Sequence, residues 1–332
     1  MTEPTTKRVT SADVARLAGV SRATVSYVLN DTPRQTISAG TRARVRDAAA
    51  RLGYAPSAAA RTLRTGRSDV VLCLLPDWPI GPEVGSALGQ LSTALTRHGL
   101  TLVVHPGNRE DRPMAELWKA ITPAAVIAYT EFSDTEIAAM RSAGVTLVVA
   151  LAGKRGQGRE PAVPQELIGR RQAEHLVLAG HVRLGYAYPD DQRVRFFAEP
   201  RLAGVRATCV ARRMPTPVGL TVPLDPAAAA DAVRRWKATG VTAVCAYNDE
   251  VALAVLAGVR RAGLQAPGDL AVIGVDDIPP ARLADPALTT VTTDQAAIGA
   301  HLAATVVAAL RGRAAPTLPP AAVVRVVTRA SA

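Results

Sequence analysis

The pattern of apolar and polar positions changes near residue 66 of this 332-residue chain. Before this point, apolar residues recur at helical spacing in short segments. After it, apolar runs of strand length alternate with longer helical segments. The runs predicted to be strands are Val70–Leu75, Leu100–His105, Ala124–Tyr129, Val145–Ala150, His181–Tyr188, Gly219–Val222, Val241–Ala246 and Leu270–Val275. Such alternation is typical of parallel sheets covered by helices, so we expect an α/β core of two doubly wound lobes.

The segment before the core is predicted to contain three short helices. Thr10 and Asp13 resemble a capping box, with Asp in place of the usual Glu. The first helix then continues through an amphipathic turn marked by Val14 and Leu17, and it ends at Gly19. A third helix is expected over about residues 39–52.

The second helix is predicted to begin after Ser21, which can cap it. Val25 and Leu29 are four residues apart and are expected to face inward. The exposed side would then carry Arg22, Ala23, Ser26 and Tyr27. Two short helices joined by a Gly-containing turn and braced by a third form a helix-turn-helix, whose second helix fits the major groove of DNA. Similar trios also occur in proteins that bind no DNA, so this pattern alone leaves both interpretations open.

The charge of the chain is concentrated in this helical head. The first 66 residues carry +7 of the formal net charge of +11. A basic head can bind nucleic acid or an anionic membrane surface, but it lacks the clustered Trp, Phe and Leu that favour insertion at a membrane interface. Double-stranded DNA is therefore the expected partner.

Several classes of protein are not favoured by the composition. The longest apolar stretches fall short of the ~18 residues that a membrane span needs, and no secretory signal is evident, so we expect a cytoplasmic protein that does not bind membranes. The cysteines, Cys73, Cys209 and Cys245, have neither metal-ligand spacing nor an even number, so no disulfide framework and no metal site are expected. We interpret them as buried small apolar residues.

Residues 9–30 and 51–57 resemble the DNA-binding head of the LacI/GalR (lactose-repressor-like) family of transcription regulators. The resemblance implies a head at residues 1–55, and it places Arg22, Ala23 and Tyr27 at base-reading positions. Tyr27 departs from the Arg that is common in the family, so it either reads bases or is a packing or phosphate-facing aromatic. The DNA-contacting residues that the resemblance implies are Thr10, Ser21, Arg22, Ala23, Thr24, Ser26, Tyr27, Asn30, Tyr54, Ala59, Ala60 and Leu63.

Residues 56–66 are expected to be a hinge. They can form one or two helical turns, too short to be stable alone in water. The resemblance implies that the hinge pairs with its dimer mate in the minor groove, where Leu63 inserts between central base pairs and kinks the duplex. The alternative is that Leu63 packs against the head.

The resemblance also implies an effector site in the core, residues 67–332. Arg201, Asn248 and Asp276 become the polar anchors for a sugar-like small molecule held between the lobes. Lobe 1 is expected at about residues 67–158 and 290–317, and lobe 2 at about 159–289 and 318–332. Two stretches depart from the family: Gln165-Glu166 before Gly169, and Trp78–Pro82 after the first strand. The first lobe is therefore remodelled, which leaves open an unusual effector, a protein partner or lost ligand control.

Other functions receive less support from the sequence. The first core strand leads into Pro76-Asp77-Trp78-Pro79 rather than a glycine-rich phosphate loop, so neither a nicotinamide cofactor nor any other is expected, and no catalytic residues are assigned. A free-standing sugar-binding receptor would need no basic head. The expected function is a homodimeric repressor of a palindromic operator, controlled by a small molecule, with ligand-independent or protein-controlled regulation as the alternative.

Overall fold

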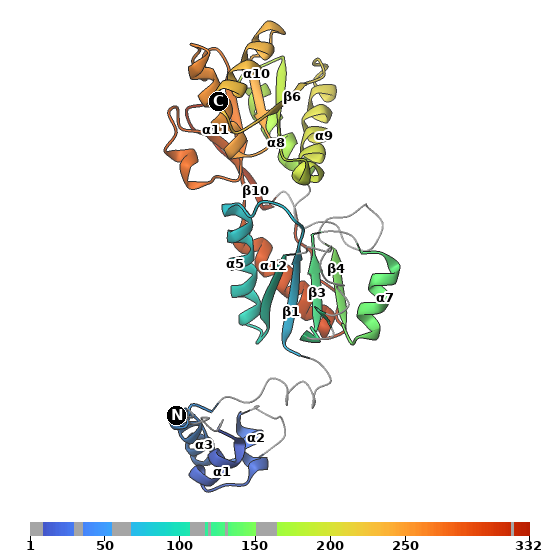
Figure 1. Cartoon of the computed structure of the whole chain (residues 1–332), viewed down its shortest axis with the longest axis vertical. Helices are drawn as coiled ribbons and strands as arrows, with labels where there is room; N and C mark the ends of the chain where they lie inside the picture. Colours follow the sequence, from blue (N-terminus) through green and yellow to red (C-terminus); the bar gives the residue numbers. More distant parts are fainter. Residues whose placement is uncertain are drawn as a thin grey trace, which may run out of the picture. The chain divides into compact units, whose positions relative to one another are not determined.

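The computed structural model describes residues 9–29, 36–54, 68–106, 117–118, 121–129, 132–150, 165–319 and 322–332. It divides into two compact units, Met1–Asp69 and Val70–Ala332, each of which is described by itself (Figure 1). The first contains the three helices of the head, and the second contains both sheets. None of the described helices is long and apolar enough to cross a bilayer.

The head is built from α1 (Ser11–Ala18), α2 (Arg22–Leu29) and α3 (Ala39–Arg51). The Asp13 carboxylate accepts hydrogen bonds from the backbone N–H (3.0 Å) and the hydroxyl (2.7 Å) of Thr10, which fixes the start of α1. Gly19 ends this helix in the left-handed conformation at φ 65°. The small side chains at the centre of the three helices are Val14, Ala15, Ala18, Val25, Val28, Val45, Ala48 and Ala49.

The inward residues predicted for α2 are confirmed, whereas one of the two residues that mark the amphipathic turn of α1 is exposed. Leu17 is 43% exposed, because Val14, Ala15 and Ala18 form the buried side of α1 instead. On α2, Val25 is buried together with Val28, and the half-buried Leu29 also packs against the apolar centre of the head. In a helix, residues three and four apart share a face, so Val25, Val28 and Leu29 all lie on the inward side of α2.

Lobe 1 is a four-stranded parallel sheet in the order β2-β1-β3-β4. Its strands are β1 (Val70–Leu75), β2 (Thr101–Pro106), β3 (Ala125–Ala128) and β4 (Leu147–Ala150). Helices α5 (Pro82–Thr96) and α12 (Gln295–Leu310) cover one face, where Val71 packs. Leu72 and Leu74 lie in the cluster on the other face, with Met140 of α7 (Asp134–Ser142). Consecutive β1 residues thus alternate between two apolar layers, as a strand buried on both faces requires.

Lobe 2 is a six-stranded sheet in the order β10-β9-β8-β7-β5-β6, parallel except for β10. The strands are β5 (Leu184–Pro189), β6 (Val218–Val222), β7 (Ala243–Ala246), β8 (Ala271–Val275), β9 (Thr289–Thr293) and β10 (Val324–Val327). The helices are α8 (Gln165–Leu178), α9 (Arg195–Ala211), α10 (Pro226–Ala238) and α11 (Asp249–Arg261), with the short 3₁₀ turns η1 (Gln192–Val194) and η2 (Pro279–Arg282). They pack in two pairs, α8 with α9 and α10 with α11 (Figure 1).

The chain passes from lobe 2 back to lobe 1 after β9, a few residues later than expected. The predicted boundary at residue 290 falls inside β9, where Val291 pairs with Val275 of β8. The passage therefore follows Thr293, and α12 then packs on α5 in lobe 1. The first passage between the lobes, expected near residue 158, lies outside the described residues.

Candidate DNA-binding surface and interlobe site

The exposed side of α2 is the candidate DNA-reading surface. Arg22 and Ala23 are exposed, while Tyr27 and Ser26 are half-buried. The Ser21 hydroxyl accepts the backbone N–H of Thr24 at 3.1 Å, and the two hydroxyls lie 2.9 Å apart. Ser21 and Thr24 thereby fix the first turn of α2, which leaves Arg22 and Ala23 presented to solvent.

The other predicted DNA-contacting residues fall into two groups. Thr10 is exposed and bonded to Asp13, whereas Tyr54 is half-buried and packs against the apolar centre of the head. Tyr54 thus has a packing role whether or not its hydroxyl reaches a phosphate. The remaining predicted residues lie outside the described part of the chain, and they are Asn30, Ala59, Ala60 and Leu63.

In lobe 2, Arg201 is a buried arginine held by the chain itself. Its Nε donates to Oε1 of Gln165 at 2.9 Å, and its Nη1 donates to the Tyr247 carbonyl at 2.5 Å. The guanidinium also lies over the Tyr247 ring, 4.9 Å from the ring centroid. Only 7% of the residue is exposed, so its position on α9 is tightly determined.

That position depends on a close approach of α8 and α9. A Cβ on Gly169 would lie 1.8 Å from the Arg201 carbonyl oxygen, and one on Gly204 would lie 2.0 Å from the Glu166 carbonyl oxygen. One glycine on each helix therefore lets the two backbones touch. This contact places the backbone of Arg201 directly against α8.

Asp276 lies at the carboxyl end of β8 in a strained turn. Asp276 and Asp277 have φ values of 110° and 54°, a region that non-glycine residues rarely adopt. Asp277 forms an ion pair with Arg329 at 2.6 Å. The Asp276 backbone N–H donates to the Val291 carbonyl at 2.8 Å. The chain thus holds a carboxylate in a conformation that needs support from the surrounding structure.

Asp249 also supports the Asp276–Asp277 turn. It is fully buried, and its Oδ2 accepts the Ile278 N–H at 2.9 Å while its Oδ1 accepts the Thr290 hydroxyl at 2.6 Å. Burial raises the pKa of Asp249 to about 7, although these two hydrogen bonds oppose the shift. The residue is thus a structural carboxyl under the Asp276–Asp277 turn.

The charge of Arg201 acts on the Asp276 carboxyl. Burial raises the pKa of Asp276 well above its ordinary value, and the charge of Arg201 opposes this shift. Asn248 directly follows Tyr247, whose carbonyl binds Arg201, but its Oδ1 caps α11 by accepting the Val251 N–H at 3.0 Å. The Asn248 side chain thus has a capping role, which leaves its amide nitrogen and one lone pair of Oδ1 for a ligand.

Glu83, near the start of α5 in lobe 1, is a polar residue of this site that the sequence analysis missed. It accepts hydrogen bonds from the Thr293 hydroxyl (3.3 Å) and the Gln295 amide. Burial raises its pKa, and its hydrogen bonds with Gln295 and Thr293 and the charge of Arg201 oppose the rise. The charge of Arg201 thus acts on one carboxyl of each lobe, Glu83 and Asp276. We call Arg201, Glu83, Asp276 and Asn248 the interlobe site.

The head and the second half of the core both match known protein families. Residues 10–57 match the bacterial regulatory proteins of the lacI family, and residues 173–332 match the periplasmic binding protein-like domain. The chain is 31% identical to the HTH-type transcriptional regulator MalR of Streptomyces coelicolor, over 92% of this chain and 91% of the relative. It is 30% identical to CelR of Thermobifida fusca, over 92% and 93%. This chain belongs to the LacI family. It is a DNA-binding transcription regulator, as the sequence predicted.

Solved structures agree with the LacI-family fold over nearly the whole chain. The Lac repressor dimer bound to operator and the anti-inducer ONPF has a TM-score of 0.73 at 23% identity, covering 98% of this chain and 99% of that one. A complex of the regulator CelR with cellobiose has a TM-score of 0.64 at 26% identity, covering 98% and 100%. The predicted architecture, a helix-turn-helix head with an α/β core of two lobes, is confirmed.

Proposed function

We propose that this LacI-family regulator is a dimeric repressor that binds an inverted-repeat operator and responds to a polar small molecule at the interlobe site. The DNA-binding part of this proposal rests on Arg22 and Ala23, which are exposed on the capped helix α2. Arg22 is proposed to bond a guanine in a bidentate way, while Thr10, Ser21, Thr24, Ser26 and Tyr54 position the head on the backbone. Tyr27 is assigned to the edge of this surface, because it is half-buried.

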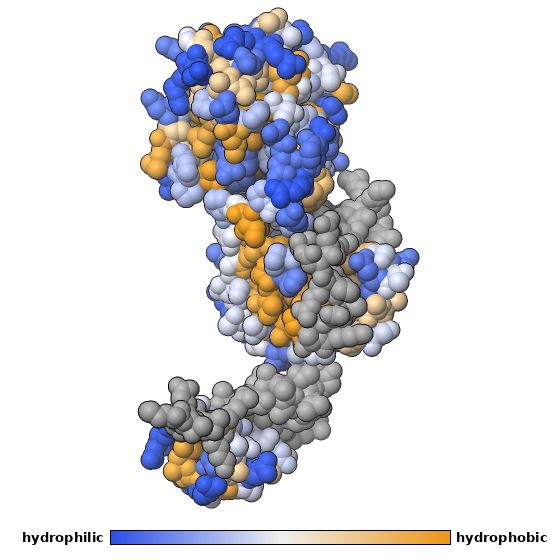
Figure 2. All heavy atoms as spheres, in the orientation of Figure 1, coloured by the Kyte–Doolittle hydropathy of each residue, from blue (hydrophilic) through white to orange (hydrophobic). Residues whose placement is uncertain are grey.

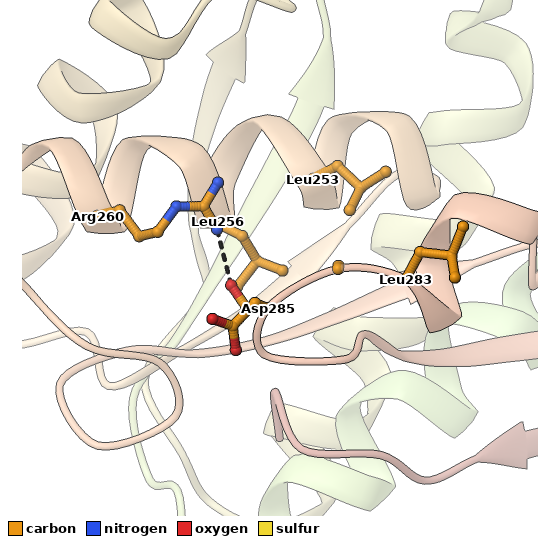
Figure 3. Close-up of a pocket in the computed structure, with 6 residues that line it drawn as sticks. Leu253, Leu256, Arg260, Leu283 and Asp285 are labelled. Carbon is orange, nitrogen blue, oxygen red and sulfur yellow. Dashed lines mark hydrogen bonds between the residues drawn. The ribbon is translucent and has the colours of Figure 1, made fainter.

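Exposed leucines beside a hollow on lobe 2 support the dimer. A hollow of about 340 Å³ lies between α11 and the segment after η2, lined by Leu253, Leu256, Arg260, Leu283, Ala284 and Asp285 (Figure 3). Arg260 closes one side by donating to the Asp285 carbonyl at 2.8 Å. Leu283 is 81% exposed beside it, and Leu224 near a neighbouring hollow is 66% exposed. Figure 2 shows apolar atoms among polar ones on the face of lobe 2 that is in view. A second copy of the chain would cover these leucines.

The purified protein is expected to select inverted-repeat sites from a random DNA library and to bind each as a dimer. Affinity should fall steeply, about 10³-fold or more between 50 and 200 mM salt, because Lys and Arg displace counterions from the phosphates. Arg22→Ala should relax sequence preference at one symmetric pair of positions, a loss of about 1–3 kcal/mol of discrimination. Arg206→Ala is the control, because Arg206 is an exposed arginine of lobe 2. It should change neither the salt dependence of operator affinity nor the sequence preference. Salt-independent binding, or unchanged preference in Arg22→Ala, would contradict the assignment.

The interlobe site supports the effector half of the proposal. Arg201, Glu83 and Asp276 offer a guanidinium and two carboxyls from different lobes, which suits the donors and acceptors of vicinal hydroxyl groups. CelR, a relative, is described in complex with cellobiose, so we infer a hydroxylated ligand of the same general chemistry. Ligand binding changes operator affinity only if the two lobe arrangements bind the ligand unequally.

Arg201→Ala is expected to preserve operator binding and to abolish the response to the effector. Typical coupling of about 1–3 kcal/mol corresponds to roughly 5- to 150-fold in operator affinity, and this factor should approach one in the variant. A ligand is first found by a thermal-shift screen of sugars and polyols with the wild type, and operator affinity is then measured with and without it. Arg206→Ala is again the control, because it lies on the exposed side of the same helix. A full response in Arg201→Ala would remove Arg201 from the site.

The second candidate is regulation without a small molecule. It is favoured by the remodelled first lobe, in which the stretch Trp78–Pro82 after β1 departs from the family. A wild type that binds its operator but shows no thermal shift with any compound of the screen would support this alternative.

A further inference from the structure

Gln172 is a fully buried amide between α8 and the sheet of lobe 2. None of its surface is exposed. Its Nε2 donates to the carbonyl oxygen of Ala246 at 2.8 Å, and it also lies 3.3 Å from that of Ile273 and 3.2 Å from that of Gly274. An apolar side chain would fill this space without bringing a polar group into the core. What distinguishes Gln172 from such a residue is its contact with three backbone carbonyls.

The three carbonyls fix the orientation of the Gln172 amide. Carbonyl oxygens accept hydrogen bonds and cannot donate them, so the NH₂ group rather than Oε1 faces them. Oε1 is buried and has no hydrogen-bond partner among the described residues. Leaving a buried acceptor unpaired is unfavourable. The contacts of Nε2 therefore hold the side chain in place at the expense of Oε1.

These carbonyls lie where β7 and β8 separate. The pairing between the two strands ends at Cys245 and Ile273. The strand β7 still pairs with β5 at Ala246, and β8 still pairs with β9 as far as Val275. Gln172 thus bridges β7 and β8 just beyond their last shared pair, at the point where the two strands part.

Two residues of the interlobe site directly follow these carbonyls. Asn248 is two residues after Ala246, and Asp276 is two residues after Gly274. Two residues of extended chain span at most about 7 Å, so the separation of the two carbonyls limits the separation of the two anchors. A bridge between the carbonyls therefore acts on both anchors at once.

The third anchor, Arg201, depends on the same helix. A Cβ on Gly169, three residues before Gln172 on α8, would lie 1.8 Å from the Arg201 carbonyl oxygen. The helix α8 therefore supports Arg201 through Gly169, and it supports Asn248 and Asp276 through Gln172. A single helix thus locates three members of the site.

We propose that Gln172 is a positioning residue of the interlobe site, whose amide holds the ends of β7 and β8 together and thereby sets the separation of Asn248 and Asp276. This inference rests on the effector half of the proposed function. Because Gln172 is fully buried, it acts on a ligand only through these anchors. Removing its donor lets the two strand ends move apart, which weakens ligand binding without altering the DNA-reading surface of the head.

Hydrogen exchange of the ligand-free, full-length protein, followed by mass spectrometry, tests the bridge itself. Gln172→Met fills nearly the same space but has no donor. The backbone N–H groups of Tyr247 and Asp276, which donate to Ala187 and Val291, should exchange roughly 2- to 12-fold faster, the effect of one lost hydrogen bond. Their rates are compared with those of α10, which packs on α11 and β6. Gln172→Leu, a second apolar replacement, is measured in parallel, so the test does not depend on the folding of one variant.

Leu176→Ala is the matched control. Leu176 is fully buried on the same helix, one turn after Gln172, so its truncation leaves a cavity and destabilises lobe 2 without removing a donor. It should speed exchange throughout the lobe, but not preferentially at Tyr247 and Asp276. A general loss of stability is thereby distinguished from the loss of the bridge.

Ligand affinity shows whether the bridge serves the interlobe site. The probes are cellobiose, glucose, galactose and sorbitol at millimolar concentration, and binding is measured by calorimetry at a temperature where every variant is folded. Gln172→Met should bind the responding probe roughly 2- to 12-fold more weakly, with unchanged operator affinity in the absence of the probe. Leu176→Ala should keep the wild-type affinity for the probe.

Two kinds of result would overturn the inference and leave the proposed function standing. In the first, exchange at Tyr247 and Asp276 in Gln172→Met changes no more than exchange in α10, so no bridge is present. In the second, exchange is faster but the probe binds as in the wild type, or Leu176→Ala weakens the probe as much, so Gln172 is structural only. If no probe binds the wild type although its operator does, the inference and the effector half of the proposed function fail together.

Discussion

Gly204→Ala is expected to destabilise lobe 2 by about 3 kcal/mol or more, the upper range for overpacking. The added Cβ would lie 2.0 Å from the Glu166 carbonyl oxygen and 2.8 Å from the Arg170 nitrogen. Both are backbone atoms of α8, so no side-chain rotation can relieve the clash. The helices would have to separate, and their separation would uncover the residues between them.

The measurement is urea unfolding of the full-length protein in the absence of operator DNA. Gly89→Ala on α5 is the matched control, because a Cβ there meets nothing within 4 Å. Replacing a helical glycine without a clash stabilises by about 0.5–1 kcal/mol, so the two variants should shift the urea midpoint in opposite directions. Equal midpoints for wild type and Gly204→Ala would show that α8 and α9 do not touch through this glycine.

The sequence predicted the architecture wherever a strand is buried on both faces of its sheet. The runs Val70–Leu75 and Val241–Ala246 are continuously apolar because helices cover both faces of the sheet, and both contain a strand with nearly the predicted bounds. In the head, Gly19 ends α1 and Ser38 caps the start of α3. Both signals depend on local backbone geometry and not on the rest of the fold.

The interlobe site was less predictable because its members meet only through tertiary packing. Arg201, Asn248 and Asp276 came from family resemblance, whereas Glu83 had no motif around it that indicates a ligand. Its partner Thr293 lies more than two hundred residues away in the chain. A carboxylate in the first turn of the helix after β1 was the available signal, since ligands of parallel sheets bind at the carboxyl ends of strands.

Asp249→Asn is expected to stabilise the core at pH 8 but much less at pH 5. Asparagine keeps the shape of Asp249, and it can accept the Ile278 N–H while donating to the Thr290 hydroxyl. The folded-state pKa of Asp249 is about 7, against 3.8 for the unfolded chain, so folding favours the protonated carboxyl. The wild type therefore loses stability as pH rises from about 4 to about 7, and the variant lacks this loss.

The difference in unfolding free energy between Asp249→Asn and wild type should narrow by roughly 2–3 kcal/mol from pH 8 to pH 5, as measured by urea unfolding at each pH. The neighbouring charges, Asp277 and Arg329, act in opposite directions on Asp249 and are present in both proteins. Asp231→Asn is the control, because Asp231 pairs with Arg234 at an exposed site. Its difference from wild type should stay small at every pH, since exposed ion pairs contribute about 0–1 kcal/mol.

The difference in unfolding free energy between Asp249→Asn and wild type could instead be the same at pH 5 and pH 8. This result would mean that Asp249 is ionised throughout, with a folded-state pKa near its ordinary value. The strained Asp276–Asp277 turn would then rest on a charged group, and its geometry would not respond to pH in this range.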